Sequence, residues 1–278
     1  MIQKPDSDSI DKKYITLVSY LKSLNSVVLA YSGGVDSTFL LKALSDAQIS
    51  ALAVTAKSPS MPIDDFNRCV SMTEKFNIPT RIIETDEMRD ERYAANTHER
   101  CFYCKSELFG KLTAIAETEG YECVIDGSNA DDLSDYRPGF KAKERFMVKS
   151  PLIEVGMSKA DIRELSQRFG LSTWDKPSSP CLASRLPYGE RVTEEALTMV
   201  SEAERALKTL GFGELRVRKH GDTARIELNA DDIEKCTQGE MRKEIVQRLK
   251  AIGFLYVLCD LEGYVSGKLN RVLKRSEQ

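Results

Sequence analysis

The sequence predicts an α/β protein: a doubly wound parallel sheet followed by a small α+β domain. Up to about residue 190, short apolar runs alternate with segments whose apolar residues recur at helical spacing. Beyond residue 193 the order changes to helix, two strands, long helix and strand. At about 150 residues per domain, 278 residues suit one large and one small domain. We therefore predict domains at 1–190 and 191–278.

The first domain has four apolar runs that predict strands. Residues 26–31 (SVVLAY) form a continuous β-rich run, which is typical of a parallel strand buried on both faces. The other predicted strands cover residues 49–56, 80–84 and 122–126. Helical spacing recurs between them, at residues 38–44, 64–76 and 105–117. This alternation favours right-handed βαβ units.

The chain after the fourth strand begins with a helix signal. Ser158 followed by Asp161 resembles a capping box at the start of a helix over 158–169. Three prolines between residues 171 and 190 predict a loop. The predicted elements of the second domain are helices at 194–210 and 231–252 and strands at 214–219, 224–228 and 254–258.

Composition excludes several classes of protein. The chain is 41% hydrophobic and 30% charged, and its 40 Lys and Arg against 43 Asp and Glu give a net charge of −3. This balance argues against a protein that coats nucleic acid. There is no run of 18 apolar residues and no apolar stretch near the polar N-terminus. We expect a cytoplasmic protein without a membrane span.

The strongest motif is the string SGGVDST, residues 32–38. It directly follows the first predicted strand and opens a helix. Two glycines let the backbone turn tightly and bring its N–H groups close to an anion, and the helix N-terminus favours negative charge. The ending Gly-Lys-Ser/Thr of a Walker A loop is absent, as is GxGxxG. The string resembles the PP-loop of ATP pyrophosphatases, which implies ATP binding and places Asp36 near a bridging Mg²⁺. The expected phosphate-binding residues are Ser32, Gly33, Gly34, Asp36, Ser37 and Thr38.

A second polar segment follows the fourth predicted strand. In open α/β sheets, ligands bind at the carboxyl ends of the strands, where this segment lies. The string DGSNADD, residues 126–132, resembles a segment of ammonia-dependent PP-loop synthetases. We expect Gly127 and Asp131 to contribute to the ATP site, with Arg137 as a phosphate clamp. An Asp- and Asn-rich turn is the alternative interpretation.

The seven cysteines divide into two groups. Cys69, Cys123, Cys236 and Cys259 lie in apolar-periodic segments, where a buried packing role is expected. Cys101 and Cys104 form a C-x-x-C pair at the start of a predicted helix, which suits a redox pair, half a zinc site or two ligands of another metal centre. With Cys181 as a third ligand, the set fits a 4Fe–4S cluster with one open iron.

Cys181 lies in a proline-flanked loop, PSSPCLASR. Arg185 is close enough in sequence to lower the pKa of the thiol or to bind a phosphate. A thiolate here could attack an activated carboxylate or carry sulfur to it.

Four strings in this order, SGGVDST, RCFYCK, DGSNADDLSDYRPG and PCLASRLPYG, resemble the LarE family over essentially the whole chain. The resemblance implies an adenine nucleotide alpha hydrolase-like fold and an ATP-dependent sulfur transferase. ATP and Mg²⁺ adenylate a carboxylate of pyridinium-3,5-dicarboxylate mononucleotide, pyrophosphate and AMP are released, and the carboxylate becomes a thiocarboxylate for the nickel-pincer nucleotide of lactate racemase. Some members sacrifice the loop cysteine. Others use three cysteines and a 4Fe–4S cluster that passes on sulfide, and this sequence resembles that branch.

The resemblance also extends to the second domain and to partners. It places acidic and basic side chains of the second domain near the sulfur-transfer site. We expect Arg185, Arg216 and Arg218 at the substrate phosphate, because guanidinium pairs with phosphate through two hydrogen bonds, and Glu204 and Glu227 as candidate metal ligands. Solvated charges on amphipathic elements are the competing interpretation. The implied partners are the small mononucleotide, sulfide or another sulfur donor, and further copies of the chain in a homo-oligomer, a hexamer in the family, with no nucleic acid.

Three other functions remain open from the sequence. A PP-loop enzyme that thiolates tRNA needs a basic surface, and residues 141–145 (KAKER) are the only dense basic patch. An ammonia-dependent synthetase of the NAD or GMP type, or an ATP-binding sensor without enzymatic activity, accounts for the loop but not for Cys101, Cys104 and Cys181.

Overall fold

The computed structural model describes residues 7–134, 138–177, 179–265 and 267–272, which group into two compact units. The first unit consists of Met1–Glu87 and Glu99–Ser179, and the second of Met88–His98 and Pro180–Gln278. The boundary predicted near residue 190 therefore falls inside the second unit. Each unit is described below by itself.

The first unit is built on a four-stranded sheet in which all described pairs of strands are parallel. Its strands are β1 (Ser26–Ala30), β2 (Ser50–Lys57), β3 (Thr80–Glu84) and β4 (Cys123–Ile125). The order β3-β2-β1-β4 means that the chain builds outward from β1 in one direction and then crosses to its other side. This confirms the predicted α/β class.

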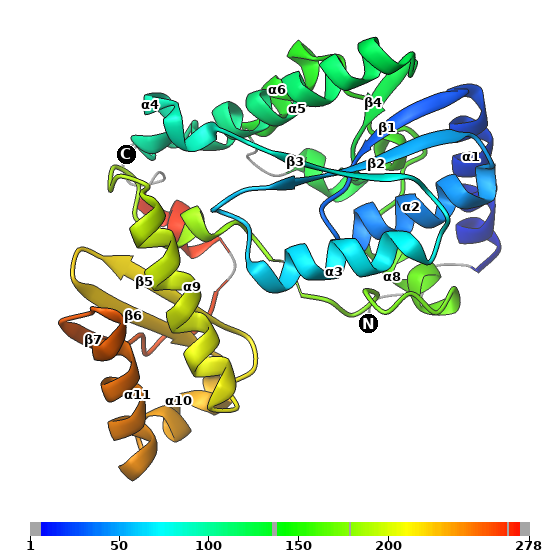
Figure 1. Cartoon of the computed structure of the whole chain (residues 1–278). Helices are drawn as coiled ribbons and strands as arrows, with labels where there is room; N and C mark the ends of the chain where they lie inside the picture. The colour runs from blue at the N-terminus through cyan, green and yellow to red at the C-terminus, as the bar shows by residue number, and fades with distance from the viewer. Residues whose placement is uncertain (1–6, 135–137, 178, 266, 273–278) are drawn as a thin grey trace. The chain divides into compact units, whose positions relative to one another are not determined.

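Helices cover both faces of this sheet (Figure 1). The larger cluster of buried side chains joins one face to α1 (Ser7–Ser23), α2 (Val35–Ala47), α3 (Ile63–Glu74), α7 (Pro151–Glu154) and α8 (Lys159–Arg168). The other face packs against α5 (Arg100–Glu119) and α6 (Gly139–Arg145). The sheet is therefore doubly wound, as its continuous apolar strands predicted.

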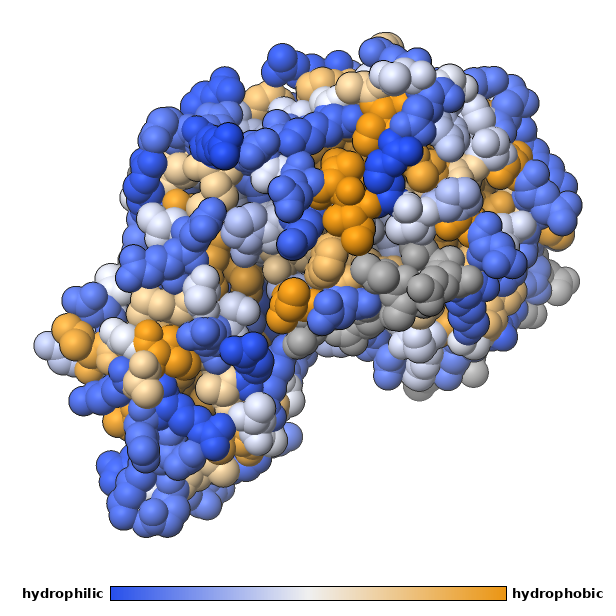
Figure 2. Space-filling model, in the orientation of Figure 1, coloured by the Kyte–Doolittle hydropathy of each residue, from blue (hydrophilic) through white to orange (hydrophobic). Residues whose placement is uncertain are grey.

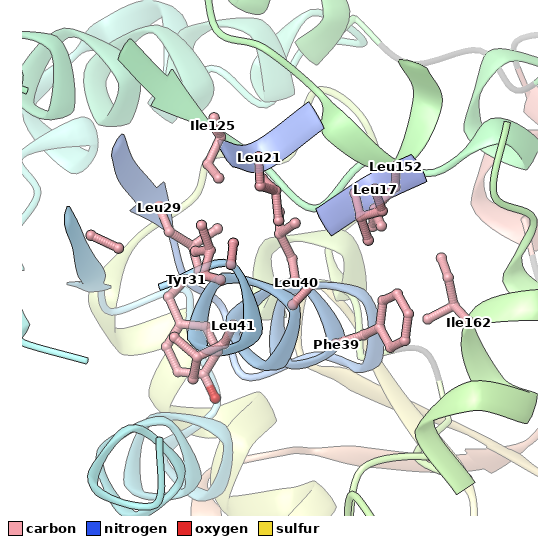
Figure 3. Close-up of a cluster of buried hydrophobic side chains, with 14 of the residues drawn as sticks. Leu17, Leu21, Leu29, Tyr31, Phe39, Leu40, Leu41, Ile125, Leu152 and Ile162 are labelled. Atoms are coloured by element: carbon pink, nitrogen blue, oxygen red, sulfur yellow. The ribbon is translucent and has the colours of Figure 1, made fainter. Parts of the chain in front are cut away.

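The side chains of β1 alternate between the two clusters of buried residues. Val27 and Leu29 belong to the α1–α2 cluster, whereas Val28 belongs to the α5–α6 cluster, because successive side chains of a strand point to opposite faces. In Figure 3, Leu21 of α1 and Leu40 of α2 lie in the first of these clusters with Leu29. Each fully buried leucine contributes about 1.5–3 kcal/mol, so these clusters hold β1 and the start of α2 in place.

Two helices differ from the sequence prediction. The helix α1 was not predicted, although its buried residues Ile10, Leu17 and Leu21 form a single helical stripe under a polar surface. The single helix predicted over 231–252 was wrong. The chain forms α10 (Ala230–Thr237) and α11 (Gly239–Ile252), with an extended residue, Gln238, between them.

The second unit is a small α+β structure, as predicted. Its sheet has the order β5-β6-β7, in which β5 (Leu215–His220) and β6 (Thr223–Leu228) are antiparallel and β7 (Tyr256–Cys259) runs parallel to β6. The helix α9 (Glu194–Thr209) is capped by Thr193, whose side chain accepts a hydrogen bond from the Ala196 N–H. The short helix α4 (Glu91–Ala94) belongs to the same unit.

The four cysteines expected to pack do so. Cys69 and Cys236 are buried in the cores of the first and second units, and Cys123 and Cys259 are partly buried against the same cores. In the part of the chain that the structure describes, no helix has the length and apolar character needed to cross a membrane.

Candidate functional site

The two polar motifs of the first unit lie beside each other at one edge of its sheet. The strands β1 and β4 are neighbours and parallel, so the loops that follow them leave the same carboxyl edge. The order of strands reverses at this point, and ligands of open α/β sheets bind in the crevice that such a reversal creates. The loop of residues 32–34, called here the phosphate loop, follows β1, and residues 126–132 follow β4.

Gly33 has the backbone conformation that the phosphate loop needs. Its φ is +63°, and a Cβ atom at this position would lie 2.5 Å from Sγ of Cys69 on α3. Gly34 is extended at φ −77° and ψ 173° and forms the N-cap of α2, without a side-chain cap. The first N–H groups of this 13-residue helix therefore face the loop, as an anion site requires.

The hydroxyl groups of the motif make internal hydrogen bonds. Ser37 Oγ lies 3.1 Å from Ser32 Oγ, and Thr38 Oγ1 lies 3.2 Å from the hydroxyl of Tyr31. Ser37 and Thr38 are both buried. They hold the loop against the end of β1, so backbone N–H groups are left as the main donors to a ligand.

Asp36 is the charged residue in the first turn of α2, directly after the phosphate loop. Its Oδ2 accepts a hydrogen bond of 2.6 Å from Nζ of Lys159, the first residue of α8. Its Oδ1 is buried and has no hydrogen-bond partner. Because a buried carboxylate oxygen without a partner is costly, this atom suits a cation or a donor from a ligand.

The segment after β4 packs directly on the phosphate loop. A Cβ atom on Gly127 would lie 2.9 Å from the backbone nitrogen of Ser37, so only glycine permits this approach. Asp131 accepts a hydrogen bond of 2.8 Å from the backbone N–H of Lys159. Lys159 thus joins the two motifs, one through its ammonium and the other through its amide. Arg137, the predicted phosphate clamp, lies outside the described residues.

A buried polar network supports the segment from behind. Ser128 donates from its N–H and hydroxyl to Asp126, and Ser150 donates to the same carboxylate at 2.7 Å. Lys143 donates to Ser150 at 2.8 Å and lies 3.7 Å from Asp126. Burial lowers the pKa of Lys143. The basic run 141–145 is therefore only partly solvated, because Lys143 points into this network while Lys141 and Arg145 are exposed.

The sequence interpretation missed Lys159 and Lys143. Lys159 follows the correctly predicted capping residue Ser158, which accepts from the Asp161 N–H. Its position could have been noticed in the sequence, because a lysine directly after a helix N-cap lies at the end of the helix. Here that end is close to the phosphate loop. Lys143 gave no such signal, because its burial depends on where α6 packs.

Cys101 and Cys104 lie in the first turns of α5. Three residues apart on a helix, they share one face, where Cys101 is exposed and Cys104 is partly buried. Two thiolates so arranged can bind one metal centre together. Cys181 belongs to the second unit. Within the described residues of each unit, no group of three His, Cys, Asp or Glu side chains lies close enough to hold a metal ion.

Arg185 organises the loop that carries Cys181. It is only 2% exposed and pairs through two nitrogens with the carboxylate of Glu204, at 2.9 and 3.1 Å. Its Nη1 donates to the carbonyl oxygens of Pro180 and Cys181, at 2.5 and 3.1 Å. All three guanidinium nitrogens donate to protein groups, so a phosphate would compete with these partners.

The remaining predicted residues of the second unit lie on β5 and β6. Arg218 pairs with Glu227 at 2.8 Å and donates to the carbonyl oxygen of Ser184 at 2.8 Å. Arg216 lies 4.9 Å from the ring of Tyr264, and burial lowers its pKa. Both carboxylates of this cluster are thus paired with arginine: Glu204 with Arg185, and Glu227 with Arg218 and also with Arg225 at 3.0 Å.

Comparison with known proteins finds relatives that match this chain along nearly the whole length of both proteins. No profile of a known protein family matches the chain. It is 36% identical over 267 residues to the pyridinium-3,5-bisthiocarboxylic acid mononucleotide synthase of Lactiplantibacillus plantarum, covering 95% of this chain and 96% of that protein. It is 44% identical to an uncharacterised protein of Synechocystis, covering 96% and 100%. An uncharacterised protein of Methanocaldococcus jannaschii is 33% identical, covering 92% and 98%.

The parallel sheet, with its two motifs side by side at one edge, defines an α/β protein consistent with the PP-loop superfamily. Identity of 36% along nearly the whole of both chains is more specific than a shared fold. The chain belongs to the LarE family, a family of sulfur-transferring synthases.

Proposed function

We propose that this protein is an ATP-dependent sulfur transferase that converts a carboxylate of pyridinium-3,5-dicarboxylate mononucleotide to a thiocarboxylate in the biosynthesis of the nickel-pincer nucleotide. The observation that carries the proposal is the phosphate loop at the β1–β4 edge, with a buried, unpartnered Oδ1 on Asp36. The printed name of the Lactiplantibacillus relative, a bisthiocarboxylic acid mononucleotide synthase, supports the substrate class.

The first step is adenylation. An oxygen of the substrate carboxylate attacks the α-phosphorus of ATP, the bond to the bridging oxygen breaks, and pyrophosphate leaves. The N–H groups at the start of α2 would bind the phosphates, and Lys159 would exchange Asp36 for a phosphate oxygen. Adenylation gives the acyl carbon a good leaving group, AMP, whereas a free carboxylate has none.

The residues present fit a magnesium ion. Asp36 offers an unpartnered carboxylate oxygen, the ligand type that Mg²⁺ prefers together with phosphate oxygens. When bound, the ion would neutralise the charge that develops on the departing pyrophosphate.

In the second step, a sulfur nucleophile attacks the acyl carbon of the adenylate. The carbon–sulfur bond forms, the bond to the AMP oxygen breaks, and the proton of the hydrosulfide goes to solvent. Arg216 and Arg218 would bind the phosphate of the mononucleotide, while Arg185 would hold the loop of Cys181 in place. Glu204 and Glu227 are proposed only as secondary cation ligands, because both already pair with arginine.

We assign Cys101, Cys104 and Cys181 as ligands of a 4Fe–4S cluster. The shared face of Cys101 and Cys104 on α5 supports this assignment. Such a cluster has one iron without a protein ligand, which supplies a place to hold sulfide. Reduced thiols at these positions fit a cytoplasmic location.

We further propose a homo-oligomer, a hexamer by resemblance to the family. The strand β7 lies at an edge of its sheet, and the exposed apolar residues of this unit include Tyr256, Leu258 and Leu261. Figure 2 shows apolar residues among hydrophilic ones on the visible face of the second unit. An exposed apolar edge strand offers unpaired backbone groups and apolar surface to another chain.

The experiment that tests the function is an anaerobic incubation with ATP, Mg²⁺, sulfide and the pyridinium dicarboxylate nucleotide. We expect AMP and pyrophosphate in equal amounts, and a product whose mass reflects exchange of oxygen for sulfur. Accumulation of ADP and phosphate instead, with no thiocarboxylate, would overturn the proposal.

A further inference from the structure

Lys176 contacts the phosphate loop from the segment that leads to Cys181. Its Nζ donates to the carbonyl oxygen of Gly33 at 3.0 Å and lies 3.1 Å from Oδ1 of Asp65 on α3. The side chains of Lys176 and Asp65 are each only 11% exposed. Neither residue has a part in the adenylation chemistry described above.

The backbone around Lys176 is fixed within the first unit. Arg163 of α8 donates to the carbonyl oxygens of Trp174 and Lys176, both at 2.7 Å. The Lys176 N–H in turn donates to the carbonyl oxygen of Thr173 at 3.1 Å. The segment is therefore anchored up to Lys176, and Cys181 follows five residues later.

One face of α3 supports the phosphate loop at two points. Asp65 and Cys69 are one helical turn apart, so they lie on the same side of α3. Cys69 packs against Gly33, and Asp65 acts on the same residue through the ammonium of Lys176. We call the contact of Asp65, Lys176 and the Gly33 carbonyl the loop clamp.

The loop clamp fixes one peptide unit of the phosphate loop. The carbonyl of Gly33 and the N–H of Gly34 belong to the same trans peptide, so they point in opposite directions. Lys176 therefore sets the direction of the Gly34 N–H, at the N-cap of α2. A phosphate oxygen that accepts from this N–H polarises the peptide and strengthens the hydrogen bond on its carbonyl side.

We propose that the loop clamp couples nucleotide in the phosphate loop to the order of the segment that carries Cys181, with Lys176 as the positioning residue. Bound phosphate tightens the hold on Lys176, and the proline at position 177 restricts the backbone of Lys176 itself. Coupling of this kind is reciprocal, so order in the segment also favours nucleotide binding. The proposal rests on the proposed function, because it requires that the loop binds ATP.

The test is hydrogen–deuterium exchange of the full chain with and without α,β-methylene-ATP and Mg²⁺, at saturating nucleotide. In the unaltered protein we expect slower exchange at residues 34–38 and, by at least about fivefold, at residues 181–186, the lower end of common coupling factors. Lys176→Met should keep the effect at 34–38 and lose it at 181–186. Lys176→Arg should restore it.

Two further variants keep the result interpretable. The double variant Asp65→Asn with Lys176→Met removes both charges of the pair. A loss of coupling in this double variant therefore cannot be caused by a buried carboxylate left without its partner. Lys75→Met changes an exposed lysine just after α3 and should behave like the unaltered protein. If residues 181–186 still respond as in the unaltered protein when Lys176→Met is present, alone or with Asp65→Asn, the coupling is overturned. If residues 34–38 of the unaltered protein do not respond to nucleotide, the proposed function itself fails.

Discussion

Lys159 and Asp36 form an ion pair of 2.6 Å across 123 residues of sequence, at the edge where the phosphate loop meets the segment after β4. The same lysine binds Asp131 through its backbone N–H. A cation at the start of α8 therefore holds together two motifs that are separate in the sequence. This pair is the point at which the proposed chemistry can be tested most directly.

Asp36→Asn should slow pyrophosphate release by about 10²-fold or more, the range seen when one group that stabilises transition-state charge is removed. Lys159→Met should slow it as well, since it removes the cation that compensates Asp36 and phosphate. Coupled-enzyme detection of pyrophosphate measures both. Lys12→Met, an exposed position on α1, serves as the control and should not change the rate.

Gly33→Ala should abolish ATP binding, because alanine at φ +63° is strained and its Cβ would overlap Sγ of Cys69. Adding Cys69→Ala should restore only part of the affinity, because it relieves the overlap and leaves the strain. Gly156→Ala is the matched control, since Gly156 has φ +64° with open space around its Cβ position. Calorimetric titration with ATP separates these effects. Normal affinity of Gly33→Ala would contradict the assigned loop.

Arg185→Lys should reduce sulfur transfer and lower the free energy of unfolding by about 2 kcal/mol, the scale of a lost hydrogen bond to a charged group. Lysine keeps the charge but cannot reach Glu204 and two loop carbonyls at once. Arg191→Lys alters an exposed pair with Glu91 and should cost about 1 kcal/mol or less. Urea denaturation together with single-turnover assays checks both. Equal behaviour of the two variants would remove Arg185 from the loop's support.

Acid should weaken the start of α8 through Asp161. Burial acts to raise the pKa of Asp161, but Lys13 at 2.7 Å and the Ser158 N–H outweigh it, so the pKa lies below its ordinary value of 3.8. Such a carboxylate stabilises the fold above pH 3.8, and this contribution is lost as the pH falls through the lowered pKa. Asp161→Asn removes the ion pair with Lys13 and should therefore cost about 1 kcal/mol at pH 7.

Thermal unfolding of Asp161→Asn and the unaltered protein, followed from pH 7 to pH 3, tests the sign. We expect the difference in Tm to persist to about pH 4 and to shrink below it. A difference that grows on acidification would show that Asp161 is not held as a carboxylate.

The cysteines distinguish the two routes of sulfur transfer. If all three ligate one cluster, alanine at Cys101, Cys104 or Cys181 should each remove the brown colour and multiple turnovers together. A sacrificial route predicts that only Cys181→Ala is inactive, with loss of H₂S from Cys181 in the active protein. Absorption near 400 nm and protein mass spectrometry decide the outcome. Stoichiometric dehydroalanine at position 181, without a need for iron, would refute the cluster.

The sequence by itself determined the order and type of most elements. The apolar run at 26–31 and the helical spacing after it are local patterns, and they predicted β1 and α2 within a few residues. The Ser158–Asp161 capping box was also visible, because an N-cap depends on residues three positions apart. The two motifs, Gly33 and Gly127 included, could be found because glycine and polar residues gather where a strand ends.

Only the tertiary structure decided which charges meet. Lys159 reaches Asp36 across 123 residues, and Lys176 reaches the Gly33 carbonyl across 143. It also showed that Arg185, predicted at the substrate phosphate, pairs with Glu204 and donates to the carbonyl oxygen of Cys181. Sequence periodicity reports which face of an element is apolar, but ion pairs form between elements. Their partners are fixed only once the sheet order and helix packing bring distant segments within hydrogen-bond distance.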